Sequence, residues 1–125
     1  MDVTNEFEAD YTENAHRLEI TIEPTAESEI HVEQSKLEYG QTVVWLGNVT
    51  DKIRDIPGVE SAYPRGDQLY FTVAKENHDV FSRILDNVFA VIETELTDAM
   101  DRTRRRLEEL SNHTVLQQDE RDSDR

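Results

Sequence analysis

The order of apolar and polar residues along the chain has two different periods. Between residues 17 and 33, and again between 59 and 73, apolar and polar side chains alternate. Such alternation is typical of strands that turn one face to a core and the other to solvent. Between residues 77 and 111, apolar side chains instead recur every three or four positions, as they do along an amphipathic helix. The pattern therefore predicts two regions of strand and one long helix.

The first region of strand is divided by a proline. Apolar residues occupy every second position from 17 to 23, and the alternation stops at Pro24. It resumes at residues 30–33, after the polar and turn-like residues 25–28. The two strands can pair as a hairpin, although a loop of this length does not fix their register. Glu19 is expected on the solvated face of the first strand.

The second region contains the clearest strand in the chain, at residues 69–73. A shorter strand at residues 59–63 precedes it, and the Pro-Arg-Gly-Asp sequence at 64–67 is typical of the turn between them. We expect these two strands to form a hairpin within an antiparallel sheet. Tyr70 is then on the face opposite Phe71, because successive side chains of a strand point to opposite faces.

The region between the strand pairs has two interpretations. One is a single helix over residues 41–56, because residues suited to a buried face recur there at helical spacing, namely Val43, Leu46, Thr50, Ile53 and Ile56. The other is a strand at residues 42–46, which are rich in strand-forming residues, followed by a break at Gly47 and a short helix. We favour the single helix, and the strand at 42–46 stays an open alternative. The Pro57-Gly58 pair ends the helix in either case.

The longest predicted element is a helix over residues 77–111, with Asn77 as its N-cap and no glycine or proline inside it. At 1.5 Å per residue this helix is about 50 Å long, whereas a domain of this size has a radius of gyration of about 13 Å. The helix therefore extends past the body that covers its first half. Its second half keeps a narrow apolar seam at the 3–4 spacing of a short coiled coil, formed by Leu96, Ala99 or Met100, Thr103, Leu107 and Leu110.

The expected element order is β-β-α-β-β-α. This order predicts an α+β fold in which a mostly antiparallel sheet of about four strands is covered on one face by two helices, as a two-layer sandwich. The expected domain spans residues 16–111 and includes the long, protruding helix. Residues 1–15 are polar and acidic and are expected to form a flexible arm. Residues 112–125 are expected to be a disordered polar tail.

Acidic residues outnumber basic residues 28 to 13, which gives a formal net charge of −15. The acid is spread over the whole chain and lysine is rare, a composition that resembles the cytoplasmic proteins of halophilic archaea that accumulate salt. At about 1 M salt the Debye length falls to roughly 3 Å, so repulsion between these charges is largely screened. We therefore expect a cytoplasmic, halophilic protein whose surface binds monovalent cations loosely. An acidic protein that mimics nucleic acid is an alternative.

The chain lacks several features on which other functions depend. It contains no cysteine, which excludes disulfides and thiolate metal sites. No apolar run reaches the length of a membrane span, and the first ten residues have neither the basic nor the apolar region of a secretory signal. With 4 glycines the chain has neither a GxGxxG nor a Walker A motif, and we expect no cofactor. The acidic surface also disfavours nucleic acid as a partner, because attraction to phosphate drives that affinity.

The histidines provide the catalytic and metal-binding hypotheses. His16 and His31 could meet across the first hairpin with Glu33 beside them, as ligands for Zn²⁺ or Ni²⁺. Ordinary polar positions on a strand face are the simpler interpretation, and no HExxH motif occurs. An enzyme that uses His31 and nearby carboxylates is a further hypothesis. The sequence leans towards a protein without catalytic activity, and we assign no catalytic or metal-binding residue.

Two candidate sites remain. The first is an interaction surface on the second half of the long helix, where the apolar seam and an arginine cluster coincide, formed by Leu96, Met100, Arg102, Arg105, Arg106, Leu107 and Leu110. Because an apolar seam that outruns its own body needs a second surface, we expect a homodimer or an accessory subunit bound to a protein partner. The second is a pocket for a small regulatory ligand, lined by Trp45, Tyr63 and Tyr70. An RNA- or DNA-associated role through the arginines at 102–106 is the further alternative.

Overall fold

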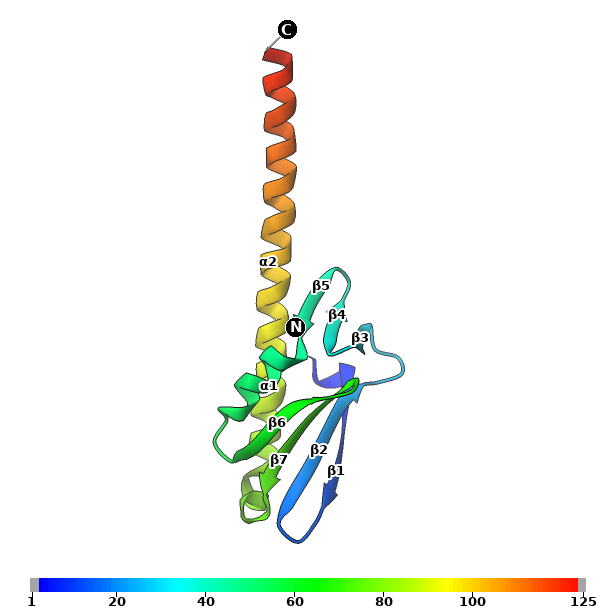
Figure 1. The fold of residues 1–125 in the computed structure, drawn as a ribbon, viewed down its shortest axis with the longest axis vertical. Helices are drawn as coiled ribbons and strands as arrows, with labels where there is room; N and C mark the ends of the chain where they lie inside the picture. The colour runs from blue at the N-terminus through cyan, green and yellow to red at the C-terminus, as the bar shows by residue number, and fades with distance from the viewer. Residues whose placement is uncertain (1–2, 124–125) are drawn as a thin grey trace.

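The computed structural model describes residues 3–123, and for residues 113–123 it describes the backbone alone. The chain folds into two antiparallel sheets and two helices, which confirms the predicted α+β class. The C-terminal helix extends far beyond the rest of the molecule (Figure 1). The described elements therefore form a body of strands and one short helix, with a second helix that is partly embedded in it and partly projects from it.

The larger sheet contains four strands, ordered β1-β2-β7-β6, and every pairing is antiparallel. Its strands are β1 (Phe7–Glu13), β2 (Arg17–Pro24), β6 (Val59–Arg65) and β7 (Gln68–Ala74). The predicted hairpin of residues 59–63 and 69–73 is confirmed as the pair β6–β7. Ile20 of β2 faces Phe71 of β7 across the sheet, and both side chains are fully buried, so the centre of the core lies on this inner face.

The smaller sheet contains three strands, ordered β3-β4-β5, with bounds β3 (Ile30–Glu33), β4 (Lys36–Tyr39) and β5 (Thr42–Trp45). The prediction that the strand at 30–33 pairs with β2 is wrong, because β2 is flanked by β1 and β7 and β3 pairs with β4. Gln34 and Ser35 both have positive φ, 52° and 62°. A two-residue turn of that conformation joins β3 and β4, and it closes a much shorter loop than pairing with β2 would.

The single helix expected at 41–56 is also wrong over its first part. Residues Thr42–Trp45 form β5, and the helix α1 spans Leu46–Arg54. In β5 the side chains of Thr42 and Val44 are buried while Val43 and Trp45 are exposed, which is the alternation of a half-buried strand. The alternative interpretation, a strand followed by a short helix, is therefore the observed one.

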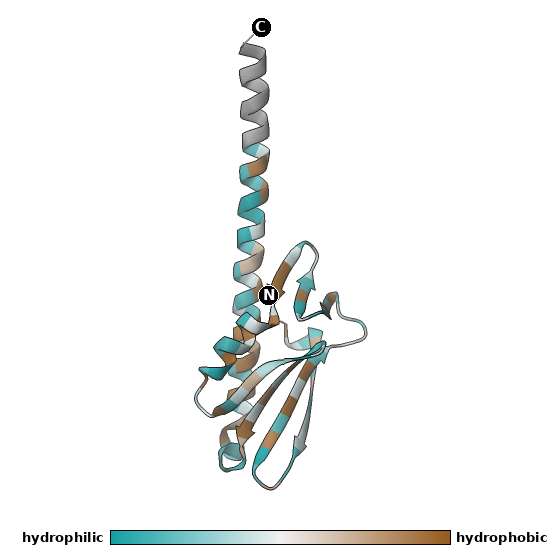
Figure 2. Cartoon of the chain, viewed as in Figure 1, coloured by the Kyte–Doolittle hydropathy of each residue, from teal (hydrophilic) through white to brown (hydrophobic). Residues whose placement is uncertain are grey.

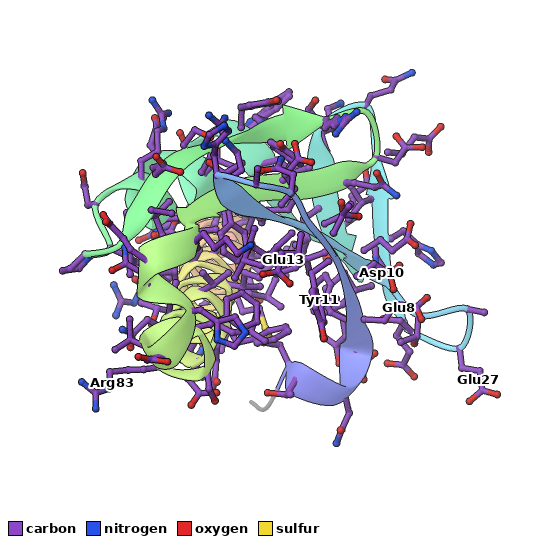
Figure 3. The ribbon with its side chains drawn as sticks, turned by 90° about the horizontal axis from the view of Figure 1, so that it is seen from below. Glu8, Asp10, Tyr11, Glu13, Glu27 and Arg83 are labelled. Atoms are coloured by element: carbon purple, nitrogen blue, oxygen red, sulfur yellow. The ribbon has the colours of Figure 1, made fainter. Side chains whose placement is uncertain are left out.

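The N-terminal residues are part of the fold, so the flexible arm expected at 1–15 is wrong for residues 3–13. After a short 3₁₀ helix at Thr4–Glu6, β1 pairs with β2 along its whole length. Val3 is fully buried and Phe7 nearly so. Seen along α2, Glu8 and Asp10 lie on one side of β1, and Tyr11 and Glu13 on the side towards the helices (Figure 3). The period of two was present in the sequence, but the many carboxylates made the segment resemble a disordered one.

The long helix α2 spans Phe81–Ser123 and follows a 3₁₀ helix at Lys75–Val80. It therefore begins four residues after the expected N-cap Asn77, because the first turns are wound more tightly. Its backbone also continues beyond the expected end at residue 111, through most of the segment expected to be a disordered tail. Residues 124 and 125 of that segment lie outside the described residues.

The core lies between the inner face of the larger sheet and the two helices. The sheet curves around the first part of α2, whose buried residues are Ile84, Val88, Ile92, Glu95, Leu96 and Ala99 (Figure 3). Helix α1 packs on β6 and β7 and contacts α2. Helices cover the inner face of the larger sheet, as the sequence predicted, and the described residues place none over the outer face that carries Glu19 and Tyr63.

Candidate interaction surface on helix α2

Helix α2 leaves the body of the protein near Thr103. Ala99 is buried and Thr103 is half-buried, whereas every side chain from Arg104 to Asn112 is exposed. Figure 2 shows apolar bands on the helix beyond the level of β5. The change from buried to exposed marks where contact with the sheets stops, because the helix itself continues without interruption.

The predicted interaction residues fall on both sides of this boundary. Leu96 is 1% exposed and belongs to the protein's own core, so it is not part of an accessible surface. Met100 is half-buried. Leu107 and Leu110 are 51% and 57% exposed. The apolar stripe that anchors α2 to the body therefore continues onto the projecting part, where two large apolar side chains meet solvent.

The arginine cluster of residues 102–106 is exposed as a group. Arg104 forms an ion pair with Asp101, with 3.4 Å between nitrogen and oxygen. Arg102 and Arg106 line a hollow of about 260 Å³ between α2 and the turn that joins β4 to β5. Arg105 is not among the residues that line it. The structure thus separates the four arginines of the cluster into Arg102 and Arg106, which share a hollow, and Arg104 and Arg105, which do not line it.

The hollow on α2 is positive in character. Besides the two arginines it is lined by Gln41, Val43, Ala99 and Thr103. The Thr103 hydroxyl donates to the carbonyl oxygen of Ala99 at 2.9 Å, so its proton is already used. The described side chains that line it include no carboxylate, although the chain has 28 acidic residues. The guanidinium groups and the Gln41 amide are therefore the donors available there.

The aromatic residues expected to form a pocket are not gathered in one place. The rings of Tyr63 and Tyr70 lie 4.9 Å apart, and the guanidinium of Arg65 lies 5.0 Å from the centre of the Tyr70 ring. Trp45 is on the smaller sheet, 53% exposed, with the Lys36 ammonium 5.2 Å from its ring centre. The two tyrosines form a pair on the outer face of the larger sheet, and Trp45 makes a separate surface contact.

Tyr70 is held by a carboxylate that sequence reasoning assigned to a solvated face. The Tyr70 hydroxyl donates to Glu19 Oε1 at 2.6 Å, and Tyr70 is 5% exposed. Burial, together with the hydrogen bond to Glu19, raises the pKa of the Tyr70 hydroxyl to about 12. Both effects favour the neutral phenol, because ionised tyrosine would be a buried anion next to a carboxylate.

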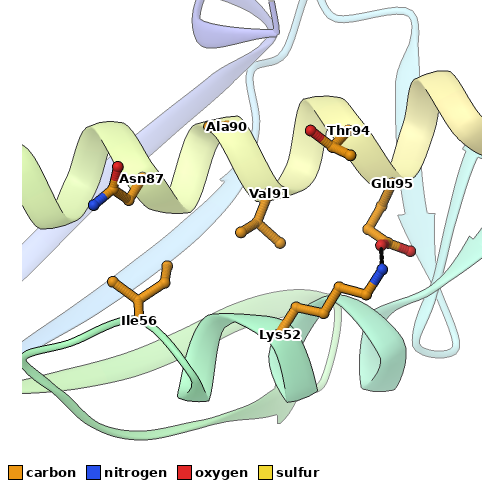
Figure 4. A pocket seen from close by; sticks show the side chains of 7 residues that line it. All are labelled: Lys52, Ile56, Asn87, Ala90, Val91, Thr94 and Glu95. Atoms are coloured by element: carbon orange, nitrogen blue, oxygen red, sulfur yellow. Dashed lines mark hydrogen bonds and ion pairs between the residues drawn. The ribbon is translucent and has the colours of Figure 1, made fainter.

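A groove between α1 and α2 was not expected from the sequence. It has a volume of about 350 Å³, and Ile56 and Val91 point into it from opposite walls (Figure 4). At one end Lys52 of α1 forms an ion pair with Glu95 of α2. Glu95 is 8% exposed, a carboxylate on the buried side of an amphipathic helix. Its position three residues after Ile92 was the available sequence signal, since that spacing places both on one helix face.

His16 and His31, the histidines proposed as metal ligands, lie on different parts of the fold. His16 precedes β2 and His31 lies on β3 of the other sheet, so no hairpin brings them together. His31 lines a polar hollow of about 480 Å³ that also includes Glu23, Glu33 and Asp67. Within the part of the chain that the structure describes, no three histidine or acidic side chains are arranged to hold a metal ion.

Comparison with known proteins identified no relative of this chain. The chain matches no protein-family model, and no curated protein or solved structure is significantly similar to it. Within the described residues, no helix combines the length and the apolar character needed to cross a bilayer. Function has to be inferred from the chain's own geometry.

Proposed function

We propose that the protein is a non-catalytic interaction domain that associates with a second copy through the projecting part of α2. The observation that supports this proposal is the exposure of Leu107 and Leu110 on an apolar stripe that begins in the core. Exposed apolar residues in a row mark contact surfaces more often than scattered ones do. The described side chains of the projecting part of α2 are all exposed, so contacts within the described chain do not explain why it keeps apolar residues. A contact with a partner would explain them.

A second copy suits this surface for two reasons. A seam with 3–4 spacing packs best against another helix with the same spacing, and every copy supplies one. The charges around Leu107 are also self-complementary. An antiparallel crossing centred on Leu107 would place Arg105 and Arg106 of one copy beside Glu109 and Glu108 of the other. Such a two-fold contact uses the same patch on both copies.

The expected association is weak. Full burial of one leucine is worth about 1.5–3 kcal/mol, and four leucines that are already half covered would contribute roughly half of that each. Association itself costs about 4–15 kcal/mol. The leucines therefore offset only the lower part of this cost, and we expect a dimer that forms at high protein concentration.

Salt should strengthen this association. Each copy carries a formal charge of −15, so two copies repel each other in dilute buffer. In a halophilic cytoplasm, which the composition suggests, the repulsion is screened within a few ångströms. The dimer is thus expected to be most stable in concentrated KCl.

Sedimentation equilibrium of the full chain tests the proposal. The protein would be studied from about 10 μM to about 1 mM, a range that covers weak dissociation constants, in about 0.1 M and about 2 M KCl. We expect the average mass to rise towards that of a dimer with concentration, and more steeply in the higher salt. A single species with the mass of one chain over the whole range would refute the proposal.

A further inference from the structure

The hollow between α2 and the β4–β5 turn contains two like charges on neighbouring helix positions. Arg102 and Arg106 are four residues apart, so their side chains lie on the same face of α2. Both are exposed, and both line the hollow. Like charges at this spacing destabilise a helix by a few tenths of a kcal/mol, about as much as unlike charges stabilise it. An anion between the two guanidinium groups would offset this repulsion.

Among the described residues, neither arginine has a carboxylate within ion-pair distance. Within the described residues, the ion pairs of the chain join Lys52 to Glu95, Arg54 to Asp51, Lys75 to Glu13 and Arg104 to Asp101. Arg102 and Arg106 belong to none of them. In a chain with 28 acidic and 13 basic residues, carboxylates are abundant, yet none of the described ones lines this hollow. The hollow is thus a local exception to an acidic surface.

We propose that Arg102, Arg106 and Gln41 form a binding site for a small oxyanion, a phosphate or carboxylate group. Guanidinium groups bind such groups through paired, charge-assisted hydrogen bonds. The Gln41 amide supplies further donors from the opposite wall, which the β4–β5 turn positions. Val43 borders the same hollow and is 45% exposed, so it offers an apolar contact to the organic part of a carboxylate or a phosphate ester.

The size of the hollow limits the ligand. A volume of about 260 Å³ lies just below the roughly 300–1,000 Å³ of sites for drug-sized molecules. A single phosphate or carboxylate group with a small substituent fits this limit. A nucleic-acid strand does not suit the site, because the remaining surface of the protein is strongly acidic and would repel its other phosphates.

The site does not require the proposed association, although the dimer would place Glu108 of the second copy beside Arg106. Arg106 and Leu107 are consecutive on α2, so their side chains point about 100° apart around the helix axis. All groups of the site belong to one chain. A protein that stays monomeric at every concentration can therefore still contain it.

Titration followed by NMR tests the proposal. The ¹⁵N-labelled full chain would be titrated with potassium phosphate and, separately, with potassium acetate, while KCl keeps the ionic strength constant. The signals of the arginine Nε–H groups report contact with the anion. We expect saturable shifts for Arg102 and Arg106, and the tighter of the two titrations identifies the phosphate or the carboxylate as the better ligand.

Three variants decide whether the binding is local. Arg102→Gln and Arg106→Gln should each weaken binding by at least about tenfold, because a charge-assisted contact is lost. Arg105→Gln removes the same charge from the same exposed helix but does not line the hollow, and it should change the affinity less than about twofold. Glutamine keeps the helix propensity of arginine, so the helix is preserved. Linear, unsaturable shifts in the wild type, or an equal loss in Arg105→Gln, would overturn the proposal.

Discussion

The hydroxyl of Tyr70 on β7 donates a hydrogen bond to Glu19 on β2, with 2.6 Å between the two oxygens. Glu19 faces Thr72 in the register of these strands, so the bond runs diagonally across the outer face of the sheet. The contact joins a phenol that is 5% exposed to a carboxylate that the sequence places on a solvated face. It shows that the outer face, although no helix covers it among the described residues, contains ordered polar contacts.

Stability should fall at high pH through Tyr70. Its pKa is raised to about 12 in the folded protein from an ordinary value of 10.0, so the folded state holds this proton more tightly. The stabilisation is fully present below the unfolded pKa and is lost as the pH rises through the folded value. Urea unfolding between about pH 9 and pH 12 should show this loss. Tyr70→Phe should flatten the curve in that window, and an unchanged curve would contradict the assignment.

Removal of the Lys52 charge should destabilise the contact between α1 and α2. Lys52→Met keeps the apolar stem but leaves the nearly buried Glu95 without its partner, and we expect a loss of about 1–2 kcal/mol in the free energy of unfolding. The matched control is Arg54→Met, which breaks the exposed pair with Asp51 on the same helix. That change should cost less than about 0.5 kcal/mol. Equal effects of the two variants would show that burial of Glu95 is unimportant.

Gly58 should not tolerate a side chain. Its φ is +99°, and a Cβ atom there would lie 2.7 Å from Cδ1 of Ile84, which is packed in the core. Gly58→Ala should therefore lower the free energy of unfolding by about 2–4 kcal/mol, from backbone strain and overpacking together. Gly66→Ala is the control, since Gly66 has φ +65° but open space around it. It should cost about 1–2 kcal/mol, and thermal unfolding of both variants measures the difference.

The exposed leucines of α2 should control association and not folding. Leu107→Ala combined with Leu110→Ala removes both exposed leucines of the part of the projecting helix whose side chains are described, so we expect dimerisation to weaken by at least about tenfold. Alanine is the best helix former, so circular dichroism should show an unchanged helix. Val80→Ala, at an exposed apolar position before α2, should leave sedimentation unaffected. Loss of the dimer in both variants would locate the contact elsewhere.

Salt should stabilise the folded monomer as well. With a net charge of −15, the repulsion within one chain is strong at about 0.1 M KCl and largely screened above about 1 M. We expect the Tm to rise steadily between these concentrations. Sucrose at matched osmolality is the control, because it stabilises by exclusion from the surface without screening charge. An equal rise in sucrose would argue against screening as the cause.

Local periodicity was sufficient to predict several elements. Residues 69–73 alternate cleanly, and the turn sequence before them fixes the β6–β7 hairpin, because both strands and the turn are adjacent in the chain. The stripe of Ile84, Val88 and Ile92 likewise predicted the buried face of α2. β1 was missed although Phe7, Ala9 and Tyr11 alternate with polar residues. In a chain this acidic, composition is a poor guide to disorder.

Contacts between distant segments could not be predicted. Lys52 and Glu95 are 43 positions apart, and Tyr70 and Glu19 are 51 apart, so no local spacing relates them. The same holds for Gln41 and Arg106, which line one hollow only because the β4–β5 turn lies beside α2. The sequence therefore predicted the arginines of the candidate oxyanion site, but not Gln41 and Val43, which line its other side.

The sequence by itself determined the β6–β7 hairpin, the long helix with its apolar face, and the acidic surface, because each depends on residue type and near neighbours. Tertiary structure alone decided which strand pairs with β2, and where the body of the protein stops along α2. That boundary separates Leu96 from Leu107, two leucines of the same seam that are 1% and 51% exposed. Their periodicity is identical. Their surroundings differ, because burial depends on what other segments of the chain lie beside a residue.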